Sequence, residues 1–205
     1  MMKMQSKKLL LTCLFTLLVV ASGYGQQSGE GSTESSGFSV RTNLLYDAFL
    51  VPTFGVEWRA NDHVGVKLDG SFSYWGSETS NIQKMWFISP EIRWYMDSPK
   101  QFYLGIGANV GEYNSYGYLL GGFYPDQTGY QGNLWSAGIT AGYQLDLSSC
   151  LMLDFNLGLG YTRSNYDSFA VIDGARVCKA KKQHNDFWGP TQAGVSLVWK
   201  LGRKK

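Results

Sequence analysis

WSAGITAGYQLDLSSCLMLDFNLGLGYT, residues Trp135–Thr162, carries the clearest β-strand pattern in the chain. In its two runs, Trp135–Asp146 and Leu151–Thr162, every odd-numbered residue is apolar or aromatic, and small or polar residues fill most even positions. A period of two residues is that of a β-strand with one apolar and one polar face. The intervening Leu147–Cys150 is short enough for a hairpin turn. The stretch therefore predicts an antiparallel hairpin with one apolar face.

The same alternation recurs along the chain from Phe38 onward. It predicts an all-β fold whose strands are Phe38–Ala48, Thr53–Ala60, His63–Tyr74, Met85–Met96, Phe102–Tyr113, Trp135–Asp146, Leu151–Thr162 and Phe187–Leu201. Most runs are eight to twelve residues long, close to the roughly 9–11 that a tilted strand needs to cross a bilayer. Aromatic residues gather near the run ends, as in the interfacial girdles of transmembrane barrels. These residues are Tyr46, Trp58, Tyr74, Trp75, Trp86, Trp94, Tyr95, Tyr113, Trp135, Tyr161, Trp188 and Trp199.

Short and long connections alternate between the predicted strands. The short ones are Asn61–Asp62, Asp97–Gln101 and Leu147–Cys150, and the long ones are Gly76–Lys84, Asn114–Leu134 and Arg163–Asp186. Outer-membrane barrels have tight periplasmic turns and longer outer loops in this alternation. An even number of strands also lets the sheet close, which removes exposed strand edges. We therefore predict an eight-stranded antiparallel up-and-down transmembrane β-barrel.

The polar faces of the predicted strands hold charged residues of both signs. They are Arg41, Asp47, Glu57, Arg59, Lys67, Asp69, Glu91, Arg93 and Asp154. An eight-stranded barrel has room inside only for side chains, and buried charges are tolerable only when they are paired. We therefore expect ion pairs to fill the lumen and to leave no open pore. Pro90 and Pro190 each remove a ladder donor, and we expect a bulge or a late strand start at both.

The first 25 residues have the layout of a secretory signal peptide. Lys3, Lys7 and Lys8 precede the apolar run Leu9–Val20, and small residues follow it. The predicted organisation is a signal peptide over 1–25, a flexible leader over 26–37 and an outer-membrane barrel domain over 38–202. Without the signal peptide the chain has 15 basic and 16 acidic side chains, so no basic balance favours nucleic acid.

The chain offers no evident catalytic, cofactor-binding or metal-binding set of residues. In the predicted topology His63 and His184, the two histidines, fall at opposite ends of the barrel and cannot act together. Cys13 leaves with the signal peptide, and a membrane about 30 Å thick separates Cys150 from Cys178. Because a disulfide needs Cα atoms within roughly 7 Å, we expect none between them.

Two predicted outer loops hold residues suited to contacts at the cell surface. Tyrosines among Gly and Asn are typical of adaptable contact surfaces, and the basic segment Arg176–Lys182 suits anionic lipopolysaccharide. The plainer alternatives are an upper aromatic girdle and an ordinary solvated loop. The predicted contact residues are Tyr116, Tyr118, Phe123, Tyr124, Tyr130, Lys179, Lys181 and Lys182.

A resemblance to known sequences rests on three segments. They are SVRTNLLYDAFLVPTFGVEWRANDHVGVKLDGSFSYW (Ser39–Trp75), FNLGLGY (Phe155–Tyr161) and FWGPTQAGVSLVWKLG (Phe187–Gly202). These segments resemble an uncharacterised Bacteroidota outer-membrane β-barrel family, a domain of unknown function whose genes often lie near fimbrial assembly genes. The resemblance implies an outer-membrane barrel linked to surface fimbriae, and it transfers no catalytic residue.

The sequence thus favours a small non-enzymatic protein of the Gram-negative outer membrane, structural in or accessory to a cell-surface assembly such as fimbriae. The expected partners are membrane lipid, lipopolysaccharide and a surface or fimbrial protein, and no cofactor is expected. One alternative is an outer-membrane lipid-modifying enzyme, which needs His, Ser and an acid together at the outer rim. Another is a soluble barrel that binds an apolar ligand, which would place the apolar residues inside.

Overall fold

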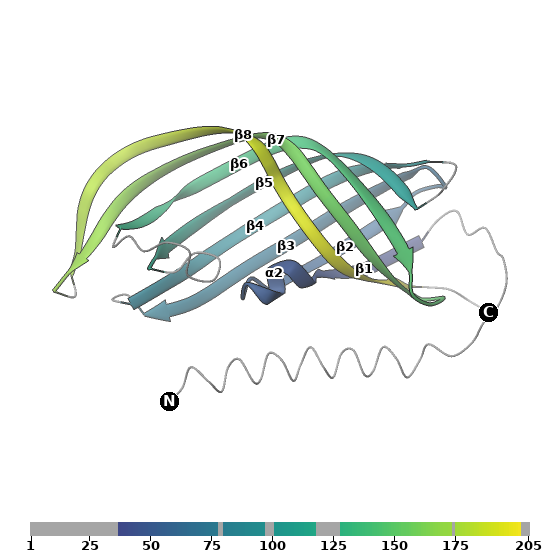
Figure 1. Cartoon of the computed structure of the whole chain (residues 1–205), viewed down its shortest axis with the longest axis horizontal. Helices are drawn as coiled ribbons and strands as arrows, with labels where there is room; N and C mark the ends of the chain where they lie inside the picture. The colour runs from purple at the N-terminus through teal and green to yellow at the C-terminus, as the bar shows by residue number, and fades with distance from the viewer. Residues whose placement is uncertain (1–36, 78–79, 97–100, 118–127, 174, 202–205) are drawn as a thin grey trace, which may run out of the picture.

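The computed structural model describes residues 37–77, 80–96, 101–117, 128–173 and 175–201. Its strands are β1 (Gly37–Asn43), β2 (Thr53–Arg59), β3 (Val64–Ser77), β4 (Ser80–Tyr95), β5 (Phe102–Tyr116), β6 (Thr128–Asp146), β7 (Leu151–Ile172) and β8 (Ala175–Leu201). Each strand pairs antiparallel with the next, and β1 pairs with β8 to close a ring of hydrogen bonds (Figure 1). The predicted all-β fold of eight antiparallel strands is confirmed. The predicted signal peptide and residues 26–36 of the predicted leader lie outside the described residues.

Alternation along the strands divides the side chains between the two faces of the ring. Ile139 on β6 and Leu157 on β7 are exposed on the outside, whereas Thr140 and Asp154 of the same strands are buried inside. The same division holds on β2, where Phe54, Val56 and Trp58 are exposed. A sheet with its large apolar side chains outside and its charges inside reverses the arrangement of ordinary water-soluble proteins.

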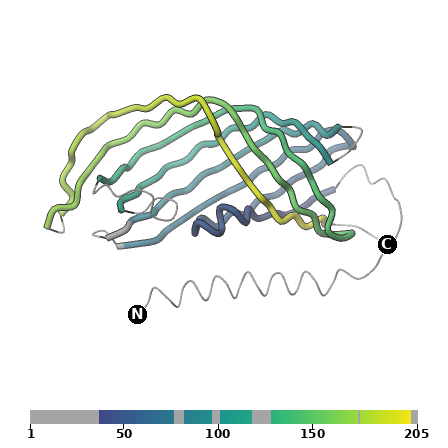
Figure 2. The backbone as a smooth tube through the Cα atoms, in the orientation of Figure 1, coloured from purple at the N-terminus to yellow at the C-terminus, as the bar shows by residue number. Residues whose placement is uncertain are grey.

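The predicted long connection Arg163–Asp186 is wrong, because β7 and β8 continue through it as a hairpin that turns at Asp173. Figure 2 shows this β7–β8 hairpin projecting beyond the other strands and bending. The register of β8 against β7 shifts on both sides of Ser168, and such bulges bend a strand. The two ends of connection Asn114–Leu134 are also strand, since β5 ends at Tyr116 and β6 begins at Thr128. Alternation fails in the hairpin because its residues are mostly polar, and Phe169–Ile172 are four apolar residues in a row.

Strand β8 has a strand neighbour on both sides only at its end. β1 pairs with Ser196–Leu201, and within the described residues the rest of β8 has β7 as its sole strand partner. The free edge carries lysines and bulges, which discourage a further strand from pairing with it.

Residues Leu44–Ala48 form the short helix α2, so the prediction of one strand over Phe38–Ala48 is wrong beyond Asn43. The Asn43 side chain accepts hydrogen bonds from the backbone nitrogens of Leu45 at 3.1 Å and Tyr46 at 3.4 Å. This is an N-cap, which starts a helix by satisfying its first free N–H groups. No helix in the described part of the chain has the length and apolar character needed to cross a membrane.

The two prolines have different effects. At Pro190 the pairing shifts by one residue between Gly158 and Leu159 of β7, so the predicted bulge is confirmed. At Pro90 the prediction is wrong, because β4 pairs with β3 through Leu68 and Pro90 without a shift. On the other side the ladder to β5 passes from Ile88 directly to Glu91 in unchanged register. The missing donor of Pro90 therefore costs local pairing but does not displace the strand.

Candidate functional site

Seven charged side chains meet in the lumen, the interior of the ring. They are Arg41 of β1, Glu57 of β2, Lys67 and Asp69 of β3, Glu91 and Arg93 of β4, and Asp154 of β7, here named the luminal charge cluster. Six of the seven are buried, and Asp69 is half-buried. The predicted pairing of charges across the lumen is confirmed.

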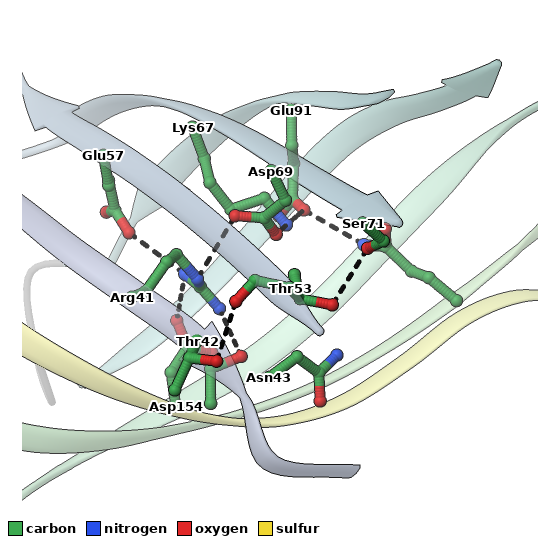
Figure 3. A network of polar contacts seen from close by, with 12 residues as sticks. Arg41, Thr42, Asn43, Thr53, Glu57, Lys67, Asp69, Ser71, Glu91 and Asp154 are labelled. Atoms are coloured by element: carbon green, nitrogen blue, oxygen red, sulfur yellow. Dashed lines mark hydrogen bonds and ion pairs between the residues drawn. The ribbon is translucent and has the colours of Figure 1, made fainter. Parts of the chain in front are cut away.

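Two arginines, Arg41 on β1 and Arg93 on β4, pair with the same carboxylates. Figure 3 shows Arg41 between Glu57 and Asp154, with Nη1 at 3.3 Å and 3.0 Å from their carboxylate oxygens. Nη1 of Arg93 lies 3.0 Å from Glu57 and 2.6 Å from Asp154. Both arginines thus share the same two acids. A charge buried this deeply is tolerable only with close partners of opposite sign.

The third cation, Lys67, extends the cluster along β3 and β4. Its Nζ lies 2.6 Å from Glu91 and 3.1 Å from Asp69. Glu91 also pairs with Nε of Arg93 at 2.9 Å and accepts a hydrogen bond from Thr140 at 3.0 Å. Three cations and four acids therefore form one connected network.

Two buried tyrosines fill the lumen between this network and the end of the ring where the short turns lie. The Tyr95 hydroxyl donates to Glu57, and the Tyr103 hydroxyl donates to Asp154 at 2.7 Å. The Arg59 guanidinium lies over the Tyr95 ring, 3.7 Å from its centroid. A Cβ at Gly142 would overlap the Tyr103 ring, so the glycine makes room for it.

The prediction that Tyr95 belongs to an outer aromatic girdle is wrong, because its side chain is 0% exposed. The sequence does hold the signal for its true position. In the predicted strand Met85–Met96, Tyr95 has the same odd-numbered phase as Glu91 and Arg93, whereas Trp94 shares the apolar phase of Ile92. Tyr103, not singled out from sequence, likewise shares the phase of the inward Gly105.

A cavity of about 640 Å³ occupies the other part of the lumen, on the side from which the β7–β8 hairpin projects. We name it the hairpin-end cavity. None of its 22 described lining residues is charged. Its walls combine aromatic rings, among them Phe87, Tyr113 and Phe187, with neutral polar groups such as Ser164 and Asn185.

The floor of the cavity separates it from the luminal charge cluster. Asn109 donates from Nδ2 to Ser136 Oγ at 2.7 Å and to the Thr191 carbonyl at 3.4 Å. Beside Thr191, Gln192 donates to Glu91 of the cluster at 3.0 Å. A layer of neutral amides and hydroxyls thus divides a charged, filled region from an uncharged, hollow one.

Helix α2 contributes Tyr46 and, just after it, Phe49 to the cavity wall. It is tied to the ring through Asp47, whose carboxylate accepts hydrogen bonds from Thr42 Oγ1 at 2.6 Å and the Thr53 backbone at 3.0 Å. Burial raises the pKa of the Asp47 carboxyl, and these two hydrogen bonds oppose that rise. The predicted strand position of Tyr46 at the outer girdle is wrong, because the helix places it at the cavity.

The predicted contact residues do not form one loop surface. Tyr116 and Tyr130 lie on β5 and β6 and line the cavity, whereas Tyr118, Phe123 and Tyr124 lie outside the described residues. Lys179, Lys181 and Lys182 are exposed on β8, and Lys179 donates to Thr128 Oγ1 at 2.7 Å. The basic segment Arg176–Lys182 is therefore a strand edge, not a loop as predicted.

The histidines and cysteines are well separated in the fold. His63 lies between β2 and β3, stacked on Trp94, and His184 lies on the exposed part of β8. Cys150, in the β6–β7 turn, and Cys178, on the projecting hairpin, are both free. Among the described residues, no group of three His, Cys, Asp or Glu side chains is arranged to hold a metal ion.

The ring and its paired luminal charges define an all-β protein with an apolar exterior and a charged core. A family described as "Protein of unknown function (DUF3575)" matches residues 10–201. The match covers most of the chain, and the protein belongs to this family. None of the curated proteins compared with the chain matches it.

Proposed function

We propose that the protein is a non-enzymatic outer-membrane β-barrel that is structural in, or accessory to, a cell-surface assembly such as fimbriae. The observation that carries the membrane proposal is the polarity of the ring, with large apolar side chains outside and paired charges inside. Water does not stabilise a continuous apolar exterior, whereas the hydrocarbon of a bilayer does. The charges inside are enclosed by the ring and paired with one another.

The exposed aromatic residues support a membrane span of suitable height. On β4, Trp86 and Trp94 both face outward and are eight residues apart, or about 27 Å along a strand that rises ~3.4 Å per residue. At the roughly 40° tilt of barrel strands this is about 21 Å along the membrane normal. Ile88 and Ile92 are exposed between them. Aromatic pairs occur at both levels, Phe38 stacked with Trp58 and Tyr161 tilted against Trp188. A transmembrane barrel has an apolar band about 25 Å tall between two such girdles.

The luminal charge cluster supports a barrel that does not conduct ions. Arg93 is 0% exposed and Lys67 is 2% exposed, so the centre of the ring is filled rather than hydrated. We propose that the hairpin-end cavity faces the outside of the cell, because the projecting β7–β8 hairpin would form the long outer connection and the short turns would face the periplasm.

Export and the link to fimbriae rest on the sequence. The basic and apolar pattern of residues 1–25 supports a signal peptide, and the resemblance stated above supports a Bacteroidota origin and a fimbrial partner. The exposed Lys179, Lys181 and Lys182 suit the anionic groups of lipopolysaccharide.

The first test separates the two membranes of the producing bacterium and compares the electrophoretic mobility of unheated and boiled protein. We expect the protein in the outer-membrane fraction, with mobility that changes on boiling. Recovery from the soluble periplasmic fraction would overturn the proposal. Deleting the gene and measuring surface fimbriae then tests the second part, which fails if fimbrial number, length and attachment are all unchanged.

Two alternatives predict different arrangements. A soluble barrel for an apolar ligand needs an apolar lumen, whereas the described lumen contains the luminal charge cluster. A lipid-modifying enzyme needs its histidine at the outer rim beside Ser and acid. His184 is the histidine on the hairpin side of the ring, so the non-enzymatic proposal expects His184→Ala to leave membrane lipid composition unchanged.

A further inference from the structure

We propose that the hairpin-end cavity is a binding site for an uncharged saccharide. Its volume of about 640 Å³ falls within the roughly 300–1,000 Å³ of small-molecule sites in proteins. The proposal depends on the chemistry of the walls and not on the membrane location of the ring.

The neutral lining of the cavity disfavours an ionic ligand. Every described lining residue is neutral, although the luminal charge cluster begins at Glu91, which accepts a hydrogen bond from Gln192 beside the floor. An anion or cation in the cavity would lose hydration without gaining a partner of opposite charge, which is costly. Asn109 and Gln192 keep the two regions apart through their bonds to Ser136 and Glu91.

The polar groups of the walls distinguish a saccharide from an acyl chain. Fourteen of the 22 lining residues are Ser, Thr, Asn or Tyr. Each hydroxyl offers one donor and two acceptor positions. Thus Tyr113 and Ser164, already 2.7 Å apart, retain capacity for a ligand. An acyl chain would displace water from these groups and leave their hydrogen bonds unmade. The hydroxyls of a sugar would form new hydrogen bonds in place of those to water.

The aromatic rings supply apolar surface for the C–H faces of a sugar. Phe87 on β4, Tyr113 on β5, Tyr166 on β7 and Phe187 on β8 line the cavity from different sides. Aromatic rings interleaved with neutral hydrogen-bonding groups match a ligand that has both apolar faces and hydroxyl edges.

The test uses full-length protein refolded in lipopolysaccharide-free amine-oxide micelles, because a sugar-based detergent would compete. Calorimetry measures the binding of four neutral probes, maltotriose, cellotriose, mannotriose and chitotriose, together with digalacturonate and laurate. We expect at least one neutral trisaccharide to bind with a Kd below 5 mM, and digalacturonate to bind at least tenfold more weakly. Tighter binding of laurate or digalacturonate, or no binding of any trisaccharide at 10 mM, would overturn the proposal.

Phe187 and Trp188 provide a matched pair of variants. They are neighbours on β8, but Phe187 lines the cavity whereas Trp188 is 77% exposed on the outer face. We expect Phe187→Ala to weaken binding about tenfold, the worth of one good ring contact, and Trp188→Ala to change it less than twofold. Equal losses in the two variants, both of which retain heat-modifiable mobility, would place the sugar outside the cavity.

A third variant, Leu134→Trp, fills the cavity instead of removing a contact. Leu134 lines the cavity on β6, and a larger ring there should abolish binding in folded protein. Competition with a neutral outer-chain glycan released from lipopolysaccharide separates two sources of the sugar. Displacement of the trisaccharide identifies a membrane glycan, and its failure identifies a free oligosaccharide, each in support of a saccharide site.

Discussion

The two parts of the lumen solve the problem of a polar interior in opposite ways. Around Arg93 and Asp154, charged side chains occupy the space and satisfy one another. Around Tyr113 and Phe187, neutral side chains line the wall and leave a cavity. The alternating pattern along the strands therefore specifies only which face of the sheet is polar. The length and charge of the inward residues then determine whether the lumen is filled or hollow.

The largest expected effect comes from breaking the filled part. Arg93→Met leaves Glu57, Glu91 and Asp154 with less compensating charge in a buried site. Removing one partner of a buried ion pair costs about 3–5 kcal/mol. Urea unfolding in micelles, followed by tryptophan fluorescence, measures the loss. A loss below about 1 kcal/mol would mean that water reaches the luminal charge cluster.

A second change tests the packing of the filled part. Gly142→Val forces a side chain into the Tyr103 ring, and overpacking of this kind costs about 1–3 kcal/mol. The matched control is Ala141→Val, which adds methyl groups on the exposed outer face of the same strand. The same unfolding experiment should show a change of at most about 0.5 kcal/mol for this control. Similar losses for both would indicate general strain on β6.

The hollow part should be less sensitive to substitution. Tyr113→Phe removes the hydroxyl that lies 2.7 Å from Ser164 Oγ, and a hydrogen bond of this kind contributes about 0.5–1.5 kcal/mol. Tyr74→Phe, at a tyrosine that is 72% exposed, serves as the control and should leave the unfolding midpoint unchanged. A loss from Tyr113→Phe as large as that from Arg93→Met would remove the distinction between the two regions.

The smallest effect is expected where an ion pair lies outside both regions. Lys200 pairs with Asp146 at 2.6 Å, but both side chains are over one third exposed. Exposed pairs contribute about 0–1 kcal/mol, so Lys200→Met should lower the free energy of unfolding by at most about 0.5 kcal/mol. This pair is closer than several pairs of the luminal charge cluster. A larger loss for Lys200→Met than for Arg93→Met would show that distance outweighs burial here.

Much of the ring is predictable because strand alternation is a local property. The strand pattern of Trp135–Thr162 and the inward position of Arg41, Lys67 and Glu91 follow directly from it. Helix α2 does not, because Leu44, Tyr46 and Ala48 alternate as well as a strand would, and the Asn43 cap acts only once the chain turns there.

The hairpin-end cavity is harder to predict, since its volume depends on what faces what across the ring. Phe87, Tyr113 and Phe187 belong to three strands, and no local pattern records the distances among them. The extension of β7 and β8 is not predicted from the sequence for a different reason. Between Thr162 and Phe187 most residues are polar, and Phe169–Ile172 are four apolar residues in a row, so the sequence shows no period of two.

The ring closes through six residue pairs, from Phe38–Leu201 to Asn43–Ser196. Phe38 and Leu201 are 163 positions apart in the chain. The pairing of β1 with β8 can therefore form only after the strands between them have paired. Pairings between distant segments form slowly, because the intervening chain loses conformational entropy before the favourable contacts between the segments have formed. Closure of β1 on β8 is therefore expected to be the last and slowest step of assembly. Until that step, Arg41 on β1 is separated from two of its partners, Asp154 on β7 and Ser196 on β8, which lie at the opposite edge of an open sheet.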